Sequence, residues 1–246
     1  MEAWASVDQR VKTSLSIFIA VLLVFGTLPL QAEEFRQSNL SRLSALGFKV
    51  APSLPQSPER SLGELRPQKE IESRFDALHA LVIWVAAPPG VVDDQGMQKR
   101  ALEGDLSPWL TEDEKAIFRK SKVEAKAQHL DSIGWQMENM WSLAWVLGFH
   151  AEPALKGQLQ GDLARELVFK FSLSGERKLR DLSDVRVLED LFYCAHNAVR
   201  SAQNGGKTVP EGFDPVTDGG GIHERRHALT WCLSPGVSWE ETDLST

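Results

Sequence analysis

The sequence has few cysteines and few basic residues, and these two shortages exclude several classes of protein. Only Cys194 and Cys232 occur among 246 residues, too few for a disulfide-stabilised scaffold or for a zinc site with four thiolate ligands. Lys and Arg number 27 against 34 Asp and Glu, which gives a formal net charge of −7. No run of five basic residues occurs either. We therefore expect no nucleic acid partner, because DNA- and RNA-binding proteins carry a basic surface.

Internal repeats and low-complexity tracts are also missing from the sequence. The composition, with 42% hydrophobic and 25% charged residues, is typical of a folded soluble protein. A chain of this length forms one large domain or two small ones.

The N-terminal segment has the pattern of an export signal. Residues 15–30 carry no charge and follow Arg10 and Lys12. A helix of that length spans about 24 Å, less than the ~30 Å hydrocarbon core of a bilayer. The pattern predicts a signal peptide over residues 1–32, cleaved after Ala32. The alternative is an uncleaved helix that anchors the protein in the inner membrane through residues 15–30. In both cases we expect a periplasmic or secreted body that meets the membrane only through this segment.

Export bears on the two cysteines. In an oxidising compartment, Cys194 and Cys232 can form one disulfide. Alternatively, both remain buried thiols that pack as small apolar side chains. The sequence leaves both interpretations open. No cysteine lies near the predicted cleavage site, so we do not expect a lipid anchor there.

Apolar residues at helical spacing predict a mainly α protein. A proline-rich lead-in at 33–68 precedes a single-domain bundle of about five helices at 69–246, and the signal or anchor helix lies before both. Thr111 and Glu114 form a capping box that opens the second helix, and Asp131 can cap the third. The third helix is apolar around most of its circumference, so we expect it at the centre. The helices are predicted at about 69–87, 112–130, 132–148, 182–202 and 222–233.

Two connecting segments have weaker patterns. Residues 168–173 alternate slightly and fit a strand or a helix end equally well. Residues 204–221 are rich in Gly and Pro and predict a loop, in which Gly219 to Gly221 let the backbone turn into the last helix.

Motifs along the chain resemble those of a known family. In the C-terminal half these are DLFYCAHNA at 190–198, ERRHALTW at 224–231 and WEE at 239–241. They resemble the D-L-x-Y-x-x-H-W-A, E-R-H-x-A-L-N-W and W-D-D motifs of the bacterial family named domain of unknown function 4272 (DUF4272). Upstream, the matching residues are Leu65, Arg66, Ile71, Arg74, Trp135, Glu138 and 145–148. By their order and spacing the chain is identified as a member of this family, which has no established activity to imply a substrate or cofactor.

The most catalytic-looking motif is H-E-x-x-H, from His223 to His227. On a helix, histidines four residues apart share a face and can bind zinc, and the glutamate, here Glu224, can activate a bound water. However, Arg225 and Arg226 lie between the two histidines, where zinc peptidases hold uncharged residues. The resembled family also has no fixed histidine at position 223. We therefore expect no metal cofactor, and zinc held by His223 and His227 is the alternative.

The same arginines have an electrostatic interpretation. Glu138 lies three and seven residues before Trp141 and Trp145, on the aromatic side of its helix. A carboxylate in that environment is costly unless it is paired, and Arg225 or Arg74 can pair with it. We predict a half-buried ion pair between Glu138 and Arg225 that joins the central helix to the last one.

A candidate polar pocket follows from these residues. Its members are Glu138, Asp190, His196, Arg225 and His227. Such a pocket can bind a small anion, or perform acid–base chemistry if a pKa is shifted. The simpler interpretation of His196 is a histidine at the edge of the core, bonded to a backbone carbonyl.

The expected function is binding without catalysis. Trp109 and Trp239 lie in turn-like segments, where they either fill the core or mark a contact surface. We expect an exported binding protein of the cell envelope whose partner is a protein or a small anionic ligand. The alternative is an envelope hydrolase, zinc-dependent if His223 and His227 coordinate the metal.

Overall fold

The computed structural model describes residues 35–56, 63–149, 151–159, 161–170 and 178–246. These residues form helices, turns and loops without a β-strand, so the mainly α prediction is confirmed. The predicted signal or anchor segment lies outside the described residues. Within the described part of the chain, no helix has the length and apolar character needed to cross a membrane.

The helices follow one another along the chain with short connections. A first helical segment covers residues 35–45. The labelled elements are α2 (Gln68–Ala86), α3 (Asp94–Leu102), η2 (Ser107–Trp109), α4 (Glu112–Phe118), α5 (Lys122–His129), α6 (Gly134–Val146), α7 (Gly161–Arg165), the π-helical η3 (Glu166–Lys170), α8 (Leu182–Gln203) and α9 (Thr217–Cys232).

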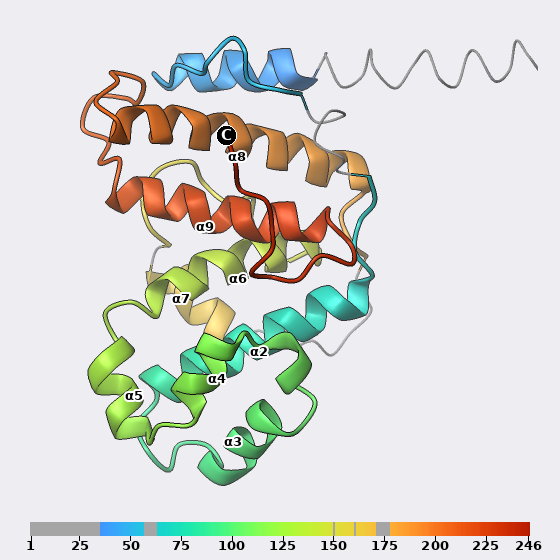
Figure 1. Ribbon diagram of the computed structural model, residues 1–246, viewed down its shortest axis with the longest axis vertical. Coiled ribbons are helices and arrows are strands. Elements are labelled where there is room, and N and C mark those ends of the chain that lie inside the picture. Colours follow the sequence, from blue (N-terminus) through green and yellow to red (C-terminus); the bar gives the residue numbers. More distant parts are fainter. Residues whose placement is uncertain (1–34, 57–62, 150, 160, 171–177) are drawn as a thin grey trace, which may run out of the picture.

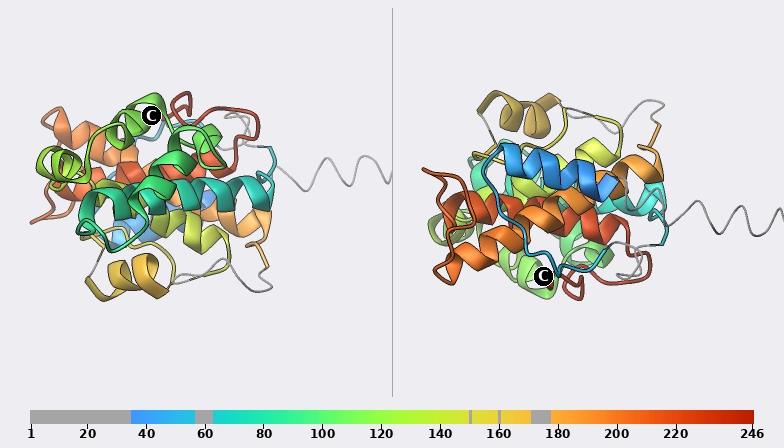
Figure 2. Two further views of the ribbon diagram at one scale, coloured as in Figure 1. Left: turned by 90° about the horizontal axis from the view of Figure 1, so that it is seen from below. Right: turned by 90° about the horizontal axis from the view of Figure 1, so that it is seen from above.

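The long helices are stacked in order across the molecule. Figure 1 shows the 35–45 segment beside α8, then α9, α6 and α2, with α3, α4 and α5 around the far side of α2. Figure 2 shows the same stack from below and from above, with the 35–45 segment lying over α8 in the second view. The chain after α9 turns toward α2 and then returns past α9 to α8 (Figure 1).

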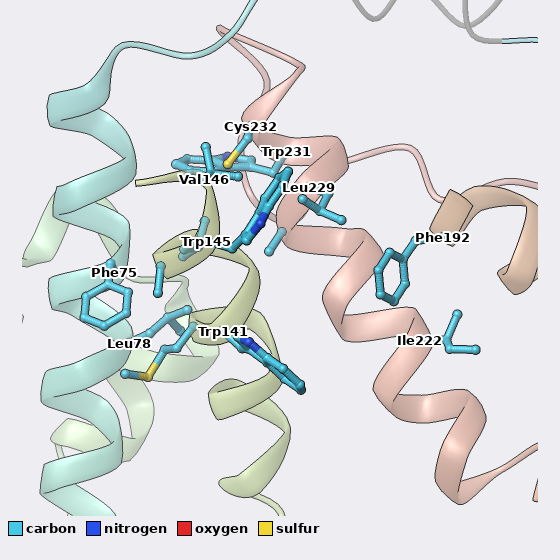
Figure 3. Packing of buried hydrophobic residues seen from close by; sticks show 14 of the residues in the cluster. Phe75, Leu78, Trp141, Trp145, Val146, Phe192, Ile222, Leu229, Trp231 and Cys232 are labelled. Carbon is cyan, nitrogen blue, oxygen red and sulfur yellow. The ribbon is translucent and has the colours of Figure 1, made fainter. Parts of the chain in front are cut away.

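Helix α6 lies at the centre of the core, as predicted. Every residue from Glu138 to Val146 is buried, because α9 packs on one side of the helix and α2 on the other. Figure 3 shows Trp141 and Trp145 of α6 between these two helices. Each large apolar side chain buried in this way stabilises the fold by about 1.5–3 kcal/mol relative to its exposed state.

The predicted helix at 112–130 is in fact two helices, α4 and α5. Thr111 and Glu114 do form the predicted capping box. A second capping box, made by Ser121 and Glu124, starts α5 and turns the chain between the two helices. The prediction for Asp131 is wrong, because α6 begins after Ile133 without a side-chain cap.

Helix α9 begins at Thr217, so the predicted 204–221 loop is too long. Gly219 to Gly221 are helical and serve close packing, not a turn. A Cβ atom at Gly219 would lie 2.6 Å from Val199 Cγ1 of α8, and one at Gly220 would lie 2.7 Å from the ring of Trp135. The lead-in also differs from the prediction, since it contains the 35–45 helical segment.

Candidate functional site

The predicted ion pair between Glu138 and Arg225 is present. Arg225 donates from Nε to Glu138 Oε2 at 2.8 Å, and its Nη2 lies 2.6 Å from the same oxygen. The two side chains are 1% and 3% exposed, so the pair is fully buried where the sequence suggested half-burial. The pair joins α9 to α6, as expected.

Backbone groups complete the hydrogen bonding of this pair. Arg225 donates to the carbonyl oxygens of Ala154 and Gly157, the second at 2.7 Å. Glu138 Oε1 accepts the backbone N–H of Leu159 at 2.8 Å. A buried ion pair is tolerated when its remaining donors and acceptors are satisfied. This pair therefore also holds the 154–159 loop against the helices.

Asp190 is paired elsewhere, with the first helical segment. Arg36 donates to Asp190 Oδ1 from Nε at 2.9 Å and from Nη2 at 2.5 Å. Asn39 donates to Asp190 Oδ2 at 2.9 Å. Asp190 is fully buried, and its carboxylate fastens residues 35–45 to α8.

His196 contacts a guanidinium group, where a backbone carbonyl was expected. Arg226 Nη1 lies 2.6 Å from His196 Nδ1, and because arginine only donates, this nitrogen must carry the lone pair. The proton is therefore on Nε2, which donates to His223 Nδ1 at 3.4 Å. Burial, followed by the charge of Arg226, lowers the pKa of His196 to about 3. The imidazole is neutral at physiological pH.

The H-E-x-x-H residues are all engaged in other contacts. His227 Nε2 donates to the carbonyl of Trp239 at 2.9 Å, and burial lowers the pKa of His227 to about 4. The rings of His223 and His227 are 6.5 Å apart between centroids. Glu224 accepts a hydrogen bond from Asn139 of α6 at 2.7 Å, and burial raises its pKa. Across the described ranges, no group of three or more His, Cys, Asp or Glu side chains is arranged to hold a metal ion.

The five predicted pocket residues therefore have three separate sets of partners. Glu138 and Arg225 form one pair, and Asp190 belongs with Arg36. His196 and His227 lie on either side of His223. The structure brings the histidines together but gives each carboxylate its own arginine.

Buried arginines are the functional feature that sequence reasoning missed. Five arginines are at most 4% exposed, and each bonds groups from a distant part of the chain: Arg36, Arg66, Arg74, Arg225 and Arg226. Arg226 donates to the carbonyls of Leu244 and Ser245 and lies 3.8 Å from Glu189. The spacing held one signal, since Arg74 lies three residues after Ile71 and four before Leu78, on the apolar face of its helix.

A cavity of about 140 Å³ lies between α2, η2 and the segment after α9. Trp109 and Trp239, the two tryptophans predicted for a contact surface, both line it. Two buried arginines also line it. The guanidinium of Arg74 lies 4.0 Å from the centroid of the Trp239 ring, and that of Arg66 lies 4.0 Å from the centroid of Trp231.

The two arginines of this cavity are held in place by bonds on other sides. Arg74 makes a two-pronged ion pair with Glu114, at 2.7 and 2.8 Å, and donates to the carbonyl of Trp109 at 2.6 Å. This corrects the alternative in which Arg74 pairs with Glu138. Arg66 donates to Glu70 at 2.8 Å and to the backbone carbonyls of Trp231, Ser234 and Val237.

The two cysteines are buried and described as thiols. This agrees with the second of the two interpretations drawn from the sequence. Burial raises the pKa of the Cys232 thiol well above its ordinary value, so this sulfur is held in its neutral form.

Comparison with known proteins identifies the family. Searches of curated proteins and of solved structures gave no match. The family described as domain of unknown function (DUF4272) matches residues 35–242. The match includes the lead-in helix as well as the helices that bear the cavity and the ion pairs. The chain therefore belongs to the DUF4272 family.

Proposed function

We propose that the protein is an exported, non-catalytic binding protein of the cell envelope, and that it holds a protein partner or a small anionic ligand. The observation that carries this proposal is the cavity between Trp109 and Trp239. Tryptophan and arginine are the side chains most enriched where proteins bind their partners. Here they line one hollow, at the surface where α2 meets the chain that follows α9.

The state of the other polar residues supports binding over catalysis. A general base works best with a pKa near the operating pH, whereas the pKa values of His196 and His227 are lowered to about 3 and about 4. The carboxylates of Glu138 and Asp190 are each bonded to a buried arginine. These groups fix the relative positions of helices and loops, and the cavity depends on those positions.

Export is supported by the N-terminal sequence. An uncharged stretch after basic residues, interrupted by Gly26 and Pro29 and followed by Ala32, is typical of a cleaved secretory signal. Expression in a bacterial host with fractionation tests this part of the proposal. We expect the protein in the periplasm or medium with Glu33 as its first residue. A chain that stays in the cytosol with residues 1–32 attached would contradict export.

The non-catalytic part is tested by metal analysis. Protein purified without a histidine tag is expected to contain far less than one zinc per chain. Near-stoichiometric zinc that disappears in the His227→Ala variant would contradict the proposal and favour the zinc-dependent hydrolase.

A further inference from the structure

We propose that the cavity between Trp109 and Trp239 binds a carboxylate group, which accepts hydrogen bonds from one edge of the Arg74 guanidinium. This inference rests on the proposed function, because it names the ligand class of the same cavity. The group belongs either to a small organic acid or to the C-terminus of a peptide. Both present the same planar, singly charged anion.

Arg74 has one unused edge. A guanidinium has five N–H donors, and the bonds to Glu114 and Trp109 use both hydrogens of Nη1 and one hydrogen of Nη2. Nε is buried without a partner among the described residues. Nε–H and the second N–H of Nη2 lie side by side along one edge. This is the geometry that accepts the two oxygens of a carboxylate.

A buried donor without an acceptor is unfavourable. Arg74 is 1% exposed, so water does not substitute for a protein partner as it does at the surface. Glu114 and Trp109 hold the guanidinium from two sides, and the Trp239 ring covers its face at 4.0 Å. The Nε–H edge is therefore fixed in position before any ligand arrives, which lowers the entropy cost of binding.

The size and lining of the cavity limit the ligand. A cavity of about 150 Å³ is known to accommodate benzene, and this one measures about 140 Å³. It therefore takes a carboxylate with a short chain, or the end of a longer ligand. Trp109, Pro108 and Val237 provide apolar wall for the carbon atoms next to the carboxylate.

The charges around the cavity favour a singly charged anion. Glu70 neutralises Arg66, and Glu114 neutralises Arg74. Glu240 also lines the cavity and is exposed, so the surroundings carry one net negative charge. A phosphate dianion is repelled more strongly than a carboxylate by this charge. Glu240 lies at the rim, where it weakens anion binding without contributing to the core.

The test is a pair of NMR titrations of the full mature chain at pH 7. The probes are butyrate with butyramide as its neutral control, and a short peptide ending in Ala with its C-terminal amide as control. We expect both acids to shift the Arg74 Nε–H signal and the Trp109 indole N–H signal in a saturable way. The amides should leave the Arg74 signal in place. The tighter of the two acids identifies the source of the carboxylate.

Two variants sharpen the test without disturbing the Arg74 ion pair. Glu240→Gln removes the rim charge, and we expect about two- to fivefold tighter binding of butyrate, as for other partly screened surface charges. Trp109→Ala removes a wall and is expected to weaken binding about tenfold or more. Circular dichroism checks that both variants are folded.

Three results would overturn the inference: an Arg74 signal that neither acid moves, equal shifts with acid and amide, or a Glu240→Gln variant that binds butyrate no better. None of them would bear on export or on zinc content, so failure here is distinguishable from failure of the proposed function.

Discussion

The ion pair between Glu138 and Arg225 makes a sharp prediction about stability. In the Glu138→Ala variant, Arg225 keeps its bonds to the carbonyls of Ala154 and Gly157 but loses its only charged partner in the pair. Removal of one member of a buried pair leaves an uncompensated charge and costs about 3–5 kcal/mol. We expect a loss of that size in the free energy of unfolding, measured by urea denaturation and followed by circular dichroism.

The double variant separates the pair itself from the cost of an unpaired charge. Glu138→Met with Arg225→Met removes both charges and keeps similar volume, so its loss is expected to be smaller than the sum of the single losses by at least about 2 kcal/mol. Glu112→Gln is the matched control, because Glu112 is an exposed partner of Lys115, and we expect no measurable change from it.

Two outcomes would refute this reasoning. If Glu138→Ala costs less than about 1 kcal/mol, the pair does not hold α6 and α9 together. If the two single losses simply add in the double variant, the two side chains act independently.

Three further predictions follow. Because the pKa values of His196 and His227 are about 3 and about 4 in the folded chain but near 6.5 when unfolded, the unfolded state binds more protons between these limits. Stability should therefore fall as the pH drops below about 6.5, and the urea midpoint should fall less in a His196→Gln/His227→Gln variant; a midpoint equally insensitive to pH in both proteins would contradict this. Gly220→Ala places a Cβ atom 2.7 Å from the Trp135 ring and is expected to cost about 1–3 kcal/mol of stability in thermal unfolding; an unchanged melting temperature would mean that α9 does not pack this closely. Buried, neutral Cys232 should react with a thiol reagent only after unfolding, and rapid labelling of the native protein would contradict its burial.

The core helix and its ion pair could be predicted from local sequence. Trp141 and Trp145 mark an aromatic helix face, and Glu138 on that face requires a cation. The spacing of Ser121 and Glu124 also contains the signal for the break between α4 and α5. The long-helix prediction missed it because the apolar spacing continues across the break.

The partners of the remaining charged residues could not be predicted in this way. Arg36 reaches Asp190, and Arg226 reaches the carbonyls of Leu244 and Ser245. Such contacts depend on which helices stack together, and no local spacing encodes that. The cavity has the same origin, since Trp109 and Trp239 meet only when the chain after α9 returns toward α2.

Hydrogen exchange at the arginine side chains tests the central claim most directly, namely that buried arginines hold distant segments of the chain together. The Nε–H groups of Arg36 and Arg225 are bonded to Asp190 and Glu138. We expect their NMR signals to exchange with solvent far more slowly than that of Arg100, whose side chain is 53% exposed. Exchange of all three at the same fast rate would contradict the account.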